Sequence, residues 1–350
     1  MHGMRMDARR RRLCGALLGG AALLALRPAG AAATRTVTYY GDRRLQLPAQ
    51  VERIATSWEA QNAIIAMLGF GDRIVATTRI VRDMPVFRRF VPGIANAALA
   101  GAGGDLNVEE LMRLKPDVLF ASAGLPQLRQ EQLERAGIAV AVFRSNSLAA
   151  LVERTLVTGE ILGAEALRQA QDYRDYFEAN VARVAAALAK VPQASRMKVY
   201  HAVGDPLSTS SRPSLNQDWM DLGGAVNVAE HWFQGGPATA KVSLEQIYAA
   251  DPDVIVAMTA RDAESMRSEP RWRGLRAVRQ GRVHANPRGM FWWSRETSEQ
   301  ALQFLWLAKT LYPDALAEVD MKQETRDFYR RFYGYRLEDG DVAEFLQPTS

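Results

Sequence analysis

The chain has 350 residues, a formal net charge of +5 and one cysteine, Cys14. The excess of positive charge lies in residues 1–33, which carry six arginines and one aspartate. Without this segment the formal net charge is zero and no cysteine remains. The remaining sequence therefore excludes disulfides and a thiolate site, and its charge gives no reason to expect a nucleic-acid partner.

Residues 1–33 have the pattern of a secretory signal peptide. A basic run, "ARRRR", precedes the apolar stretch "LCGALLGGAALLAL" and the small residues "PAGAAA", which is the order of an n-region, an h-region and a cleavage site. We expect cleavage near Ala33, by the Sec or the twin-arginine route, and a periplasmic protein. The 317 residues that remain suffice for two domains, and none of their apolar runs is long enough to span a membrane.

Strand-like and helix-like segments alternate from residue 51 onward, as in a parallel sheet covered by helices. The predicted strands and helices of the first half are 51–57, 59–69, 73–78, 117–122, 126–137, 138–143 and 147–163. Residues 164–191 then contain neither Gly nor Pro and are rich in helix formers, which predicts one long helix. The alternation resumes with 198–203, 216–224, 244–250, 253–258, 282–287 and 298–312.

These elements predict an α/β protein with two Rossmann-like lobes, whose parallel sheets are joined by a single long α-helix. The predicted boundaries are 34–163 for the N-terminal lobe, 164–194 for the connecting backbone helix, and 195–350 for the C-terminal lobe with a C-terminal extension. Because one long helix resists bending, we expect the cleft between the lobes to close only slightly on ligand binding.

One segment occurs twice. "NVEELMRLKPDVLF" (107–120) returns as "SLEQIYAADPDVIV" (243–256), each time as a helix followed by Pro-Asp and a strand. Asn107 and Ser243 are typical N-cap residues, and Ser243 with Gln246 fits a capping box. Capping does not require Glu109 and Glu245 at the second helical position. A favourable interaction with the helix dipole explains either glutamate alone, and a docking carboxylate in each lobe is the alternative.

The chain resembles the helical-backbone (class III) substrate-binding proteins of ABC importers for iron siderophores and cobalamin. The resemblance covers most of residues 50–313 and is carried by both copies of the repeat, "DWMDLGGAVNVAE" (218–230) and "WWSRETSEQALQFLWLAKTLYPD" (292–314). It implies that one acidic residue of each lobe docks on a permease dimer, and Glu109 and Glu245 occupy the matching positions. It also implies a monomer that contacts the membrane only through the permease.

Candidate ligand-binding residues follow from the rule that ligands bind beyond the carboxyl ends of parallel strands. They are Trp58, Arg79, Arg82 and Arg144 in the first lobe, beside Ser57, Ala123 and Gly124, and His201, Arg261, Trp292, Trp293 and Arg295 in the second. Trp292 and Trp293 are adjacent and point to opposite sides of an extended loop, so they cannot both belong to the core, and we expect at least one of them in the pocket. Aromatic faces beside Arg295 and a helix N-terminus suit a bulky, anionic chelate.

The sequence predicts an exported binding protein without enzymatic activity and without a cofactor, whose ligand is a metal chelate such as a ferric siderophore. The histidines are too scattered for a protein-bound metal site, so we expect the metal to arrive within its chelator. Cobalamin, haem, a metal–amino-acid complex and an oxyanion such as molybdate remain alternatives. An exported hydrolase is disfavoured, because Lys198 of Ser195-x-x-Lys198 leads into a strand instead of lying on a helix.

Overall fold

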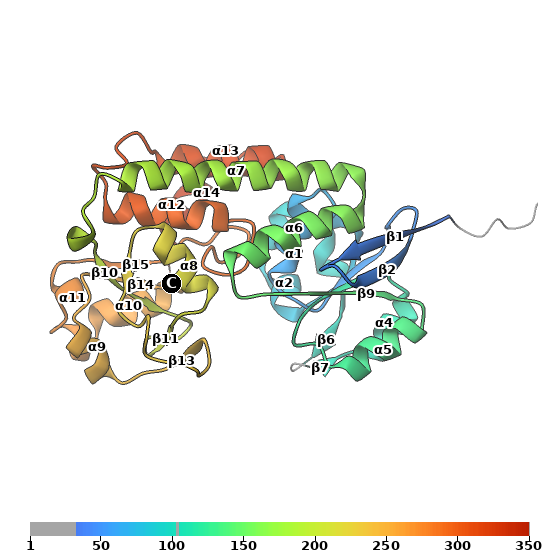
Figure 1. Cartoon of the computed structure of the whole chain (residues 1–350), viewed down its shortest axis with the longest axis horizontal. Helices are drawn as coiled ribbons and strands as arrows, with labels where there is room; N and C mark the ends of the chain where they lie inside the picture. Colours follow the sequence, from blue (N-terminus) through green and yellow to red (C-terminus); the bar gives the residue numbers. More distant parts are fainter. Residues whose placement is uncertain (1–32, 103–104, 350) are drawn as a thin grey trace, which may run out of the picture. The chain divides into compact units, whose positions relative to one another are not determined.

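The computed structural model describes residues 33–102 and 105–349, and these form two α/β lobes joined by a long helix (Figure 1). The predicted fold class is confirmed, since each lobe contains a parallel sheet with helices packed around it. The predicted signal peptide, apart from Ala33, lies outside the described residues. Within those residues, no helix combines the length and the apolar character that a membrane span requires.

The N-terminal lobe is built on a five-stranded sheet in the order β5-β4-β3-β8-β9, with every neighbouring pair parallel. Strand β8, which lies inside this sheet, is buried along nearly its whole length, as expected for a parallel strand with helices on both faces. The strands are β3 (Ile54–Thr56), β4 (Ile74–Thr77), β5 (Ala98–Leu99), β8 (Val118–Ser122) and β9 (Ala139–Phe143).

The helices of this lobe agree with the sequence patterns, although they are slightly shorter at their ends. Helix α6 begins after Ser147, whose side chain accepts a hydrogen bond from the Ala150 amide at 3.1 Å. Short helices α2 and α3 were not predicted. The helices are α1 (Gln61–Met67), α2 (Arg79–Asp83), α3 (Pro85–Phe90), α4 (Val108–Leu114), α5 (Gln127–Arg135) and α6 (Leu148–Leu162).

An antiparallel hairpin of β1 (Thr34–Tyr39) and β2 (Arg43–Pro48) precedes the sheet and was also not predicted. The Tyr39 hydroxyl accepts a hydrogen bond from the Val142 amide of β9 at 3.1 Å. The hairpin therefore covers the edge of the sheet, where unpaired backbone groups would otherwise invite other strands. A smaller antiparallel pair, β6 (Gly101–Ala102) and β7 (Asp105–Leu106), follows β5.

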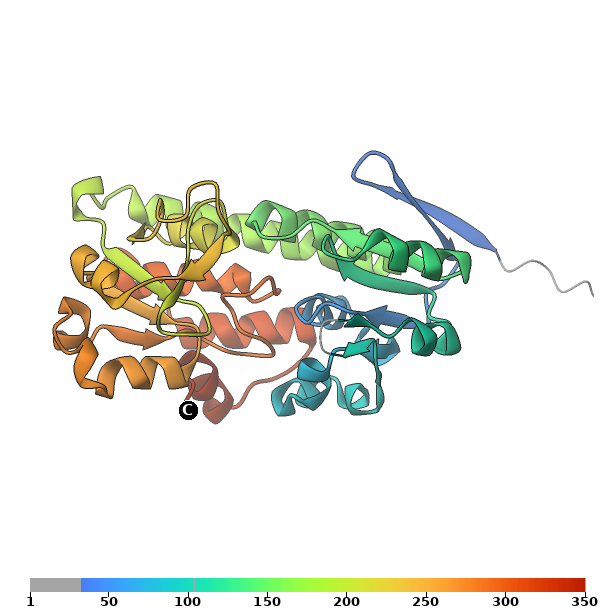
Figure 2. The same ribbon diagram turned by 90° about the horizontal axis from the view of Figure 1, so that it is seen from below.

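The C-terminal lobe also combines strands with surrounding helices (Figure 2). Its parallel sheet has four strands in the order β12-β10-β14-β15. Its strands are β10 (Lys198–Ala202), β12 (Val226–Asn227), β14 (Val254–Ala257) and β15 (Val283–Ala285). Strands β11 (Ser208–Ser210) and β13 (Thr239–Lys241) form a separate antiparallel pair. The helices are α8 (Leu215–Leu222), α9 (Leu244–Ala250), α10 (Ala260–Ser268), α11 (Arg276–Arg279) and α12 (Gln300–Leu311).

The connecting helix is α7 (Ala164–Leu188), which has 25 residues. It packs closely against α6, because Gly159 leaves room for it: a Cβ there would lie 2.9 Å from Ala166, Leu167 and Ala170. Gly163, at φ +126°, makes the turn between the two helices in a conformation that other residues avoid. The sharp reversal between α6 and α7 thus depends on two glycines.

The C-terminal extension forms two helices, α13 (Met321–Tyr333) and α14 (Asp339–Leu346). Helix α13 lies beside α7 (Figure 1). The rings of Tyr173 and Phe332 meet edge to face with centroids 5.7 Å apart. It also reaches the N-terminal lobe, where the Tyr333 hydroxyl donates a hydrogen bond to the Ala63 carbonyl at 3.1 Å. The extension therefore forms part of the hydrophobic core.

Candidate ligand-binding site

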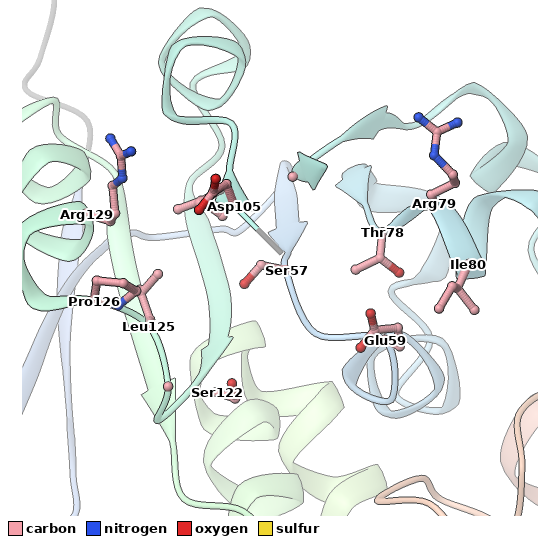
Figure 3. Close-up of a pocket in the computed structure, with 13 residues that line it drawn as sticks. Ser57, Glu59, Thr78, Arg79, Ile80, Asp105, Ser122, Leu125, Pro126 and Arg129 are labelled. Carbon is pink, nitrogen blue, oxygen red and sulfur yellow. The ribbon is translucent and has the colours of Figure 1, made fainter. Parts of the chain in front are cut away.

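A cavity of about 440 Å³ lies at the carboxyl ends of the N-terminal strands, where the strand rule predicted a ligand (Figure 3). Its walls come from the segments after β3, β4 and β8 and from the β6–β7 pair. In Figure 3, Ser57 lies between Arg129 on one side and Thr78 and Glu59 on the other. Predicted residues Ser57, Arg79 and Gly124 line this cavity.

Charges of both signs line this first cavity. Arg79 and Arg129 supply guanidinium groups, while Glu59 and Asp105 supply carboxylates. Among the described residues, none of these four takes part in an ion pair within 4.0 Å. The buried hydroxyl of Thr78 likewise lacks a hydrogen-bond partner within this part of the chain. The walls can therefore offer donors and acceptors to a ligand without first breaking an internal ion pair.

A second, smaller cavity of about 150 Å³ lies at the carboxyl ends of the C-terminal strands. It brings together His201 and Arg295, both of which the sequence predicted as ligand contacts. Its other polar lining residues are Asn146, Asn216, Thr239, Ser294 and Glu296. Since Asn146 comes from the loop between β9 and α6, residues of both lobes form this cavity.

His201 is neutral in the folded protein. Its side chain is 1% exposed, and desolvation lowers the pKa of the imidazole to about 3. Its ring lies edge to face against Trp219, with centroids 5.0 Å apart. Neither ring nitrogen has a hydrogen-bond partner among the described residues, and the same holds for the Ser294 hydroxyl. This cavity therefore holds polar atoms whose partners a ligand could supply.

We expect His201 to make the protein sensitive to acid. Between the unfolded pKa of about 6.5 and the folded value of about 3, only the unfolded state takes up the proton. Stability should fall with decreasing pH in this window, by up to about 1.4 kcal/mol per pH unit. Urea unfolding from pH 7.5 to 4.5 measures this slope, which should be shallower in His201→Gln. His231→Gln, at an exposed position, is the control, and an unchanged slope in His201→Gln would contradict the assignment.

The predicted tryptophans line neither cavity. Trp293 is fully buried, which does not fit direct contact with a ligand in this conformation. Trp292 is half-buried beneath Arg288, whose guanidinium carbon lies 4.5 Å from the ring centroid. Trp58 is 7% exposed and stacks against Arg154 at 3.9 Å. The aromatic surfaces expected for the ligand are thus already covered by protein groups.

The remaining predicted arginines also lie outside both cavities. Arg82 pairs with Asp83 at 3.4 Å, and Arg144 lies 4.3 Å above the ring of Tyr40. Arg261 is exposed on α10. Each of these three side chains lies outside both cavities. An arginine that follows a strand therefore does not always reach the cavity wall.

Sequence reasoning missed several residues that line the cavities, chiefly Glu59, Asp105, Arg129, Asn146 and Glu296. Arg129 lies in the first turn of α5, several residues after the end of β8, and Asp105 belongs to the β6–β7 pair. The strand rule selects the residues directly after each strand, and both positions lie beyond them. The first turn of the helix after β8 is the sequence signal that identifies Arg129.

The described residues contain no group of three or more His, Cys, Asp or Glu side chains arranged to hold a metal ion. The two cavities instead offer guanidinium, hydroxyl, amide and carboxylate groups together with one neutral imidazole. This chemistry suits recognition of a polar ligand by hydrogen bonds and charge.

The family model for periplasmic binding proteins matches residues 54–288 of the sequence. This chain belongs to the periplasmic binding protein family. Proteins of this family bind solutes for ABC transporters and are not enzymes, so the hydrolase alternative is set aside. The resemblance predicted from the sequence motifs is confirmed.

Known relatives and solved structures agree with this assignment. The molybdate-binding protein MolA of Haemophilus influenzae is 25% identical over 342 residues, covering 89% of this chain and 95% of the relative. A cobalamin-binding protein of Halobacterium salinarum is 26% identical over 225 residues, covering 62% of this chain and 57% of the relative. The crystal structure of a periplasmic solute-binding protein from Veillonella parvula has a TM-score of 0.79 at 23% identity, covering 90% and 97% of the two chains.

The two glutamates of the repeat lie on the surface of this periplasmic binding protein, one in each lobe. Glu109 is the second residue of α4 and Glu245 the second residue of α9, and both are exposed. The predicted capping box of Ser243 and Gln246 is present. Hydrogen bonds from the Glu245 amide and the Ser243 hydroxyl lower the pKa of the Glu245 carboxyl.

Proposed function

We propose that this periplasmic binding protein captures a metal chelate, with a ferric siderophore as the first candidate, and delivers it to the permease of an ABC importer. The volume of the first cavity, about 440 Å³, carries this proposal. Sites for organic ligands typically measure about 300–1,000 Å³. A chelate with an organic shell fits this range, whereas a four-oxygen anion would fill a small part of it.

The charges of the first cavity indicate which chemical groups the chelate should expose. Glu59 and Asp105 would repel a purely anionic ligand, while Arg79 and Arg129 would attract its oxygens. A chelate that exposes both anionic oxygens and cationic or hydrogen-bonding groups meets all four side chains favourably. A hydroxamate siderophore or an amino-carboxylate complex has this character. We propose that Arg79 and Arg129 contact such a ligand, and that His201 and Arg295 contact it from the second cavity.

A small oxyanion is the second candidate, and the second cavity favours it. A volume of about 150 Å³ is closer to the size of such an anion, and Arg295 provides a charge that can meet it. The amides of Asn146 and Asn216 can add hydrogen bonds. The relative from Haemophilus influenzae is by its name a molybdate-binding protein.

Calorimetric titration of the mature chain, residues 34–350, distinguishes the two candidates. The titrants are a ferric hydroxamate, a ferric catecholate, a nickel–histidine complex, cyanocobalamin and sodium molybdate. We expect micromolar or tighter binding of a chelate and no heat from molybdate. Tight binding of molybdate alone would replace the first candidate with the second.

Arg295→Ala should weaken binding of the ligand that this titration identifies by about 10- to 100-fold, because a hydrogen bond to a charged group contributes about 1.5–3 kcal/mol. The melting temperature should change little, since the side chain is exposed. Arg261→Ala, an exposed arginine that lines neither cavity, is the matched control. Normal affinity in Arg295→Ala would remove this residue from the site, and Arg79→Ala would then test the first cavity alone.

We also propose that residues 1–33 direct export and that the mature chain is a monomer. N-terminal sequencing of the protein recovered from the periplasm tests cleavage near Ala33, and light scattering after gel filtration tests the oligomeric state. A retained leader or a dimer would contradict the respective proposal.

A further inference from the structure

Arg154 is a charged residue in the interior of the protein. It lies in the middle of α6, its side chain is 1% exposed, and none of the ion pairs among the described residues includes it. Desolvation lowers the pKa of its guanidinium to about 10, so it remains charged at neutral pH. A buried charge without a paired carboxylate lowers the stability of the folded state. The contacts of Arg154 indicate which role it has in the interior.

The guanidinium of Arg154 contacts both lobes. Its carbon atom lies 3.9 Å from the centroid of the Trp58 ring in the N-terminal lobe, a cation–π geometry. Its Nη2 donates a hydrogen bond to the backbone carbonyl of Glu296 in the C-terminal lobe. A single planar group is therefore held between an indole of one lobe and a carbonyl of the other.

On the N-terminal side, this contact leads directly to the first cavity. Trp58 stands between Ser57 and Glu59, which both line that cavity. The Trp58 carbonyl accepts a hydrogen bond from the Asn62 amide at 3.1 Å, and Asn62 in turn accepts one from the Thr77 hydroxyl at 2.7 Å. The loop that Arg154 stacks against is thus joined to β4, at whose end Thr78 and Arg79 line the same cavity.

On the C-terminal side, the contact leads to the second cavity. Glu296 and its neighbour Arg295 line that cavity. The Glu296 carboxylate accepts a hydrogen bond from the Asn146 amide, and the Asn146 side chain accepts one from the Leu215 amide at 3.2 Å. The carbonyl that Arg154 holds therefore belongs to a wall that residues of both lobes complete.

We propose that Arg154 is a positioning residue that fixes the walls of the two cavities relative to each other. Arg79 of the first wall and Arg295 of the second are then held at a constant separation for the ligand. Its role in ligand binding rests on the proposed function, whereas its role in holding the two walls does not. Trp58, predicted from the sequence as a ligand contact, acts in this arrangement as the surface against which Arg154 is held.

Hydrogen exchange of the ligand-free mature chain, followed by mass spectrometry, tests the proposal without reference to any ligand. Arg154→Met should raise exchange about tenfold or more in both residues 57–62 and residues 294–299, while the two sheets keep their protection. Thr155→Val is the matched control, because Thr155 is also buried in α6 and its hydroxyl donates a hydrogen bond within the helix, to the Leu151 carbonyl. The control should leave both segments unchanged.

Two further variants keep the test decisive. Arg154→Lys retains the charge but lacks the planar guanidinium, so exchange in both segments should rise to a smaller extent. If Arg154→Met does not fold, the Arg154→Lys variant tests the proposal. Trp58→Leu removes only the N-terminal contact, yet it should also raise exchange in residues 294–299. Loosening of only one segment in the Arg154 variants, or an unchanged 294–299 segment in Trp58→Leu, would overturn the proposal. Because no ligand is used, such a failure is distinct from failure of the proposed function.

Discussion

Deletion of residues 314–350 should prevent the chain from folding stably, although these residues lie outside the segment that matches the family model. Helices α13 and α14 bury Phe328, Tyr329, Phe332 and Phe345 almost completely. Each large apolar side chain contributes about 1.5–3 kcal/mol on burial. Four of them approach the whole stability of a typical domain, about 5–15 kcal/mol. Circular dichroism and thermal melting of the truncated chain measure the loss.

A single substitution in α13 tests the contribution of the extension to stability on a smaller scale. Phe332→Ala should lower the free energy of unfolding by about 3–5 kcal/mol, the usual cost of removing a buried aromatic ring. The ring contacts Tyr173 and Tyr176 of α7, so the cavity would open between two helices. Arg330→Ala, an exposed position on the same helix, is the control. A truncated chain that melts cooperatively at the normal temperature would show that the extension is an appendage.

The extension also supports the binding site indirectly. The buried carboxylate of Glu299 accepts hydrogen bonds from the Tyr329 hydroxyl at 2.9 Å, the Phe291 amide at 3.0 Å and the Ser298 hydroxyl at 3.1 Å. Without α13, this carboxylate would lose the Tyr329 hydroxyl as one of its donors, which is unfavourable for a buried charged group. The segment from Phe291 to Glu299 carries Arg295. Changes in the extension should therefore reach the second cavity through Glu299.

The alternation of strands and helices was readable from the sequence because it depends on local periodicity. The segments that became β8 and α6 carried a clear pattern of apolar residues, and the segment that became α7 contained helix formers without Gly or Pro. Their ends agree with the predicted ends or are up to three residues shorter, because periodicity does not determine where a helix or strand stops. The β1–β2 hairpin was missed because its role, covering the edge of β9, depends on a strand about a hundred residues away.

The binding site was less predictable, since it depends on side chains that meet only in the folded chain. Two arginines that follow strands of the C-terminal lobe, Arg295 and Arg261, end in different places: Arg295 lines a cavity, whereas Arg261 lines neither. Trp293 is buried although it adjoins Arg295 and the half-buried Trp292. Nothing local distinguishes Arg154 from a surface arginine, because its partners lie on other elements and in both lobes.

The repeated segment has a structural reason that the sequence did not reveal. The Asp117 carboxylate accepts hydrogen bonds from the amides of Glu52 and Arg53 at 2.7 and 2.8 Å, just before β3. Its counterpart, Asp253, accepts one from the Lys198 amide at 2.9 Å, at the start of β10. Each aspartate thus ties its own strand to the central neighbouring strand. Capping and strand alignment explain the N-cap, the helix and the Pro-Asp pair. For Glu109 and Glu245 the structural reason is the helix dipole, and the Glu245 carboxyl also accepts hydrogen bonds from its own amide and the Ser243 hydroxyl; docking is the alternative that the repeat suggests for both.

We therefore expect Glu109→Lys combined with Glu245→Lys to abolish uptake of the transported ligand while leaving the isolated protein nearly normal. Both carboxylates are exposed on helices α4 and α9, one in each lobe. Two carboxylates on equivalent units suit a partner with two equivalent basic pockets, such as a permease dimer. Charge reversal replaces attraction with repulsion at both contacts, and this acts on association and specificity.

Three measurements on the double variant decide between docking and simple stabilisation of the helix dipole. Uptake in cells that carry the cognate permease should fall to the level without binding protein, whereas calorimetric ligand affinity should stay normal and the melting temperature should fall by no more than a few degrees. Glu165→Lys is the matched control, because Glu165 is an exposed second residue of α7 that lies outside the repeat. It carries the same cost against the helix dipole but should transport normally. Full uptake by the double variant would mean that Glu109 and Glu245 serve their helices alone.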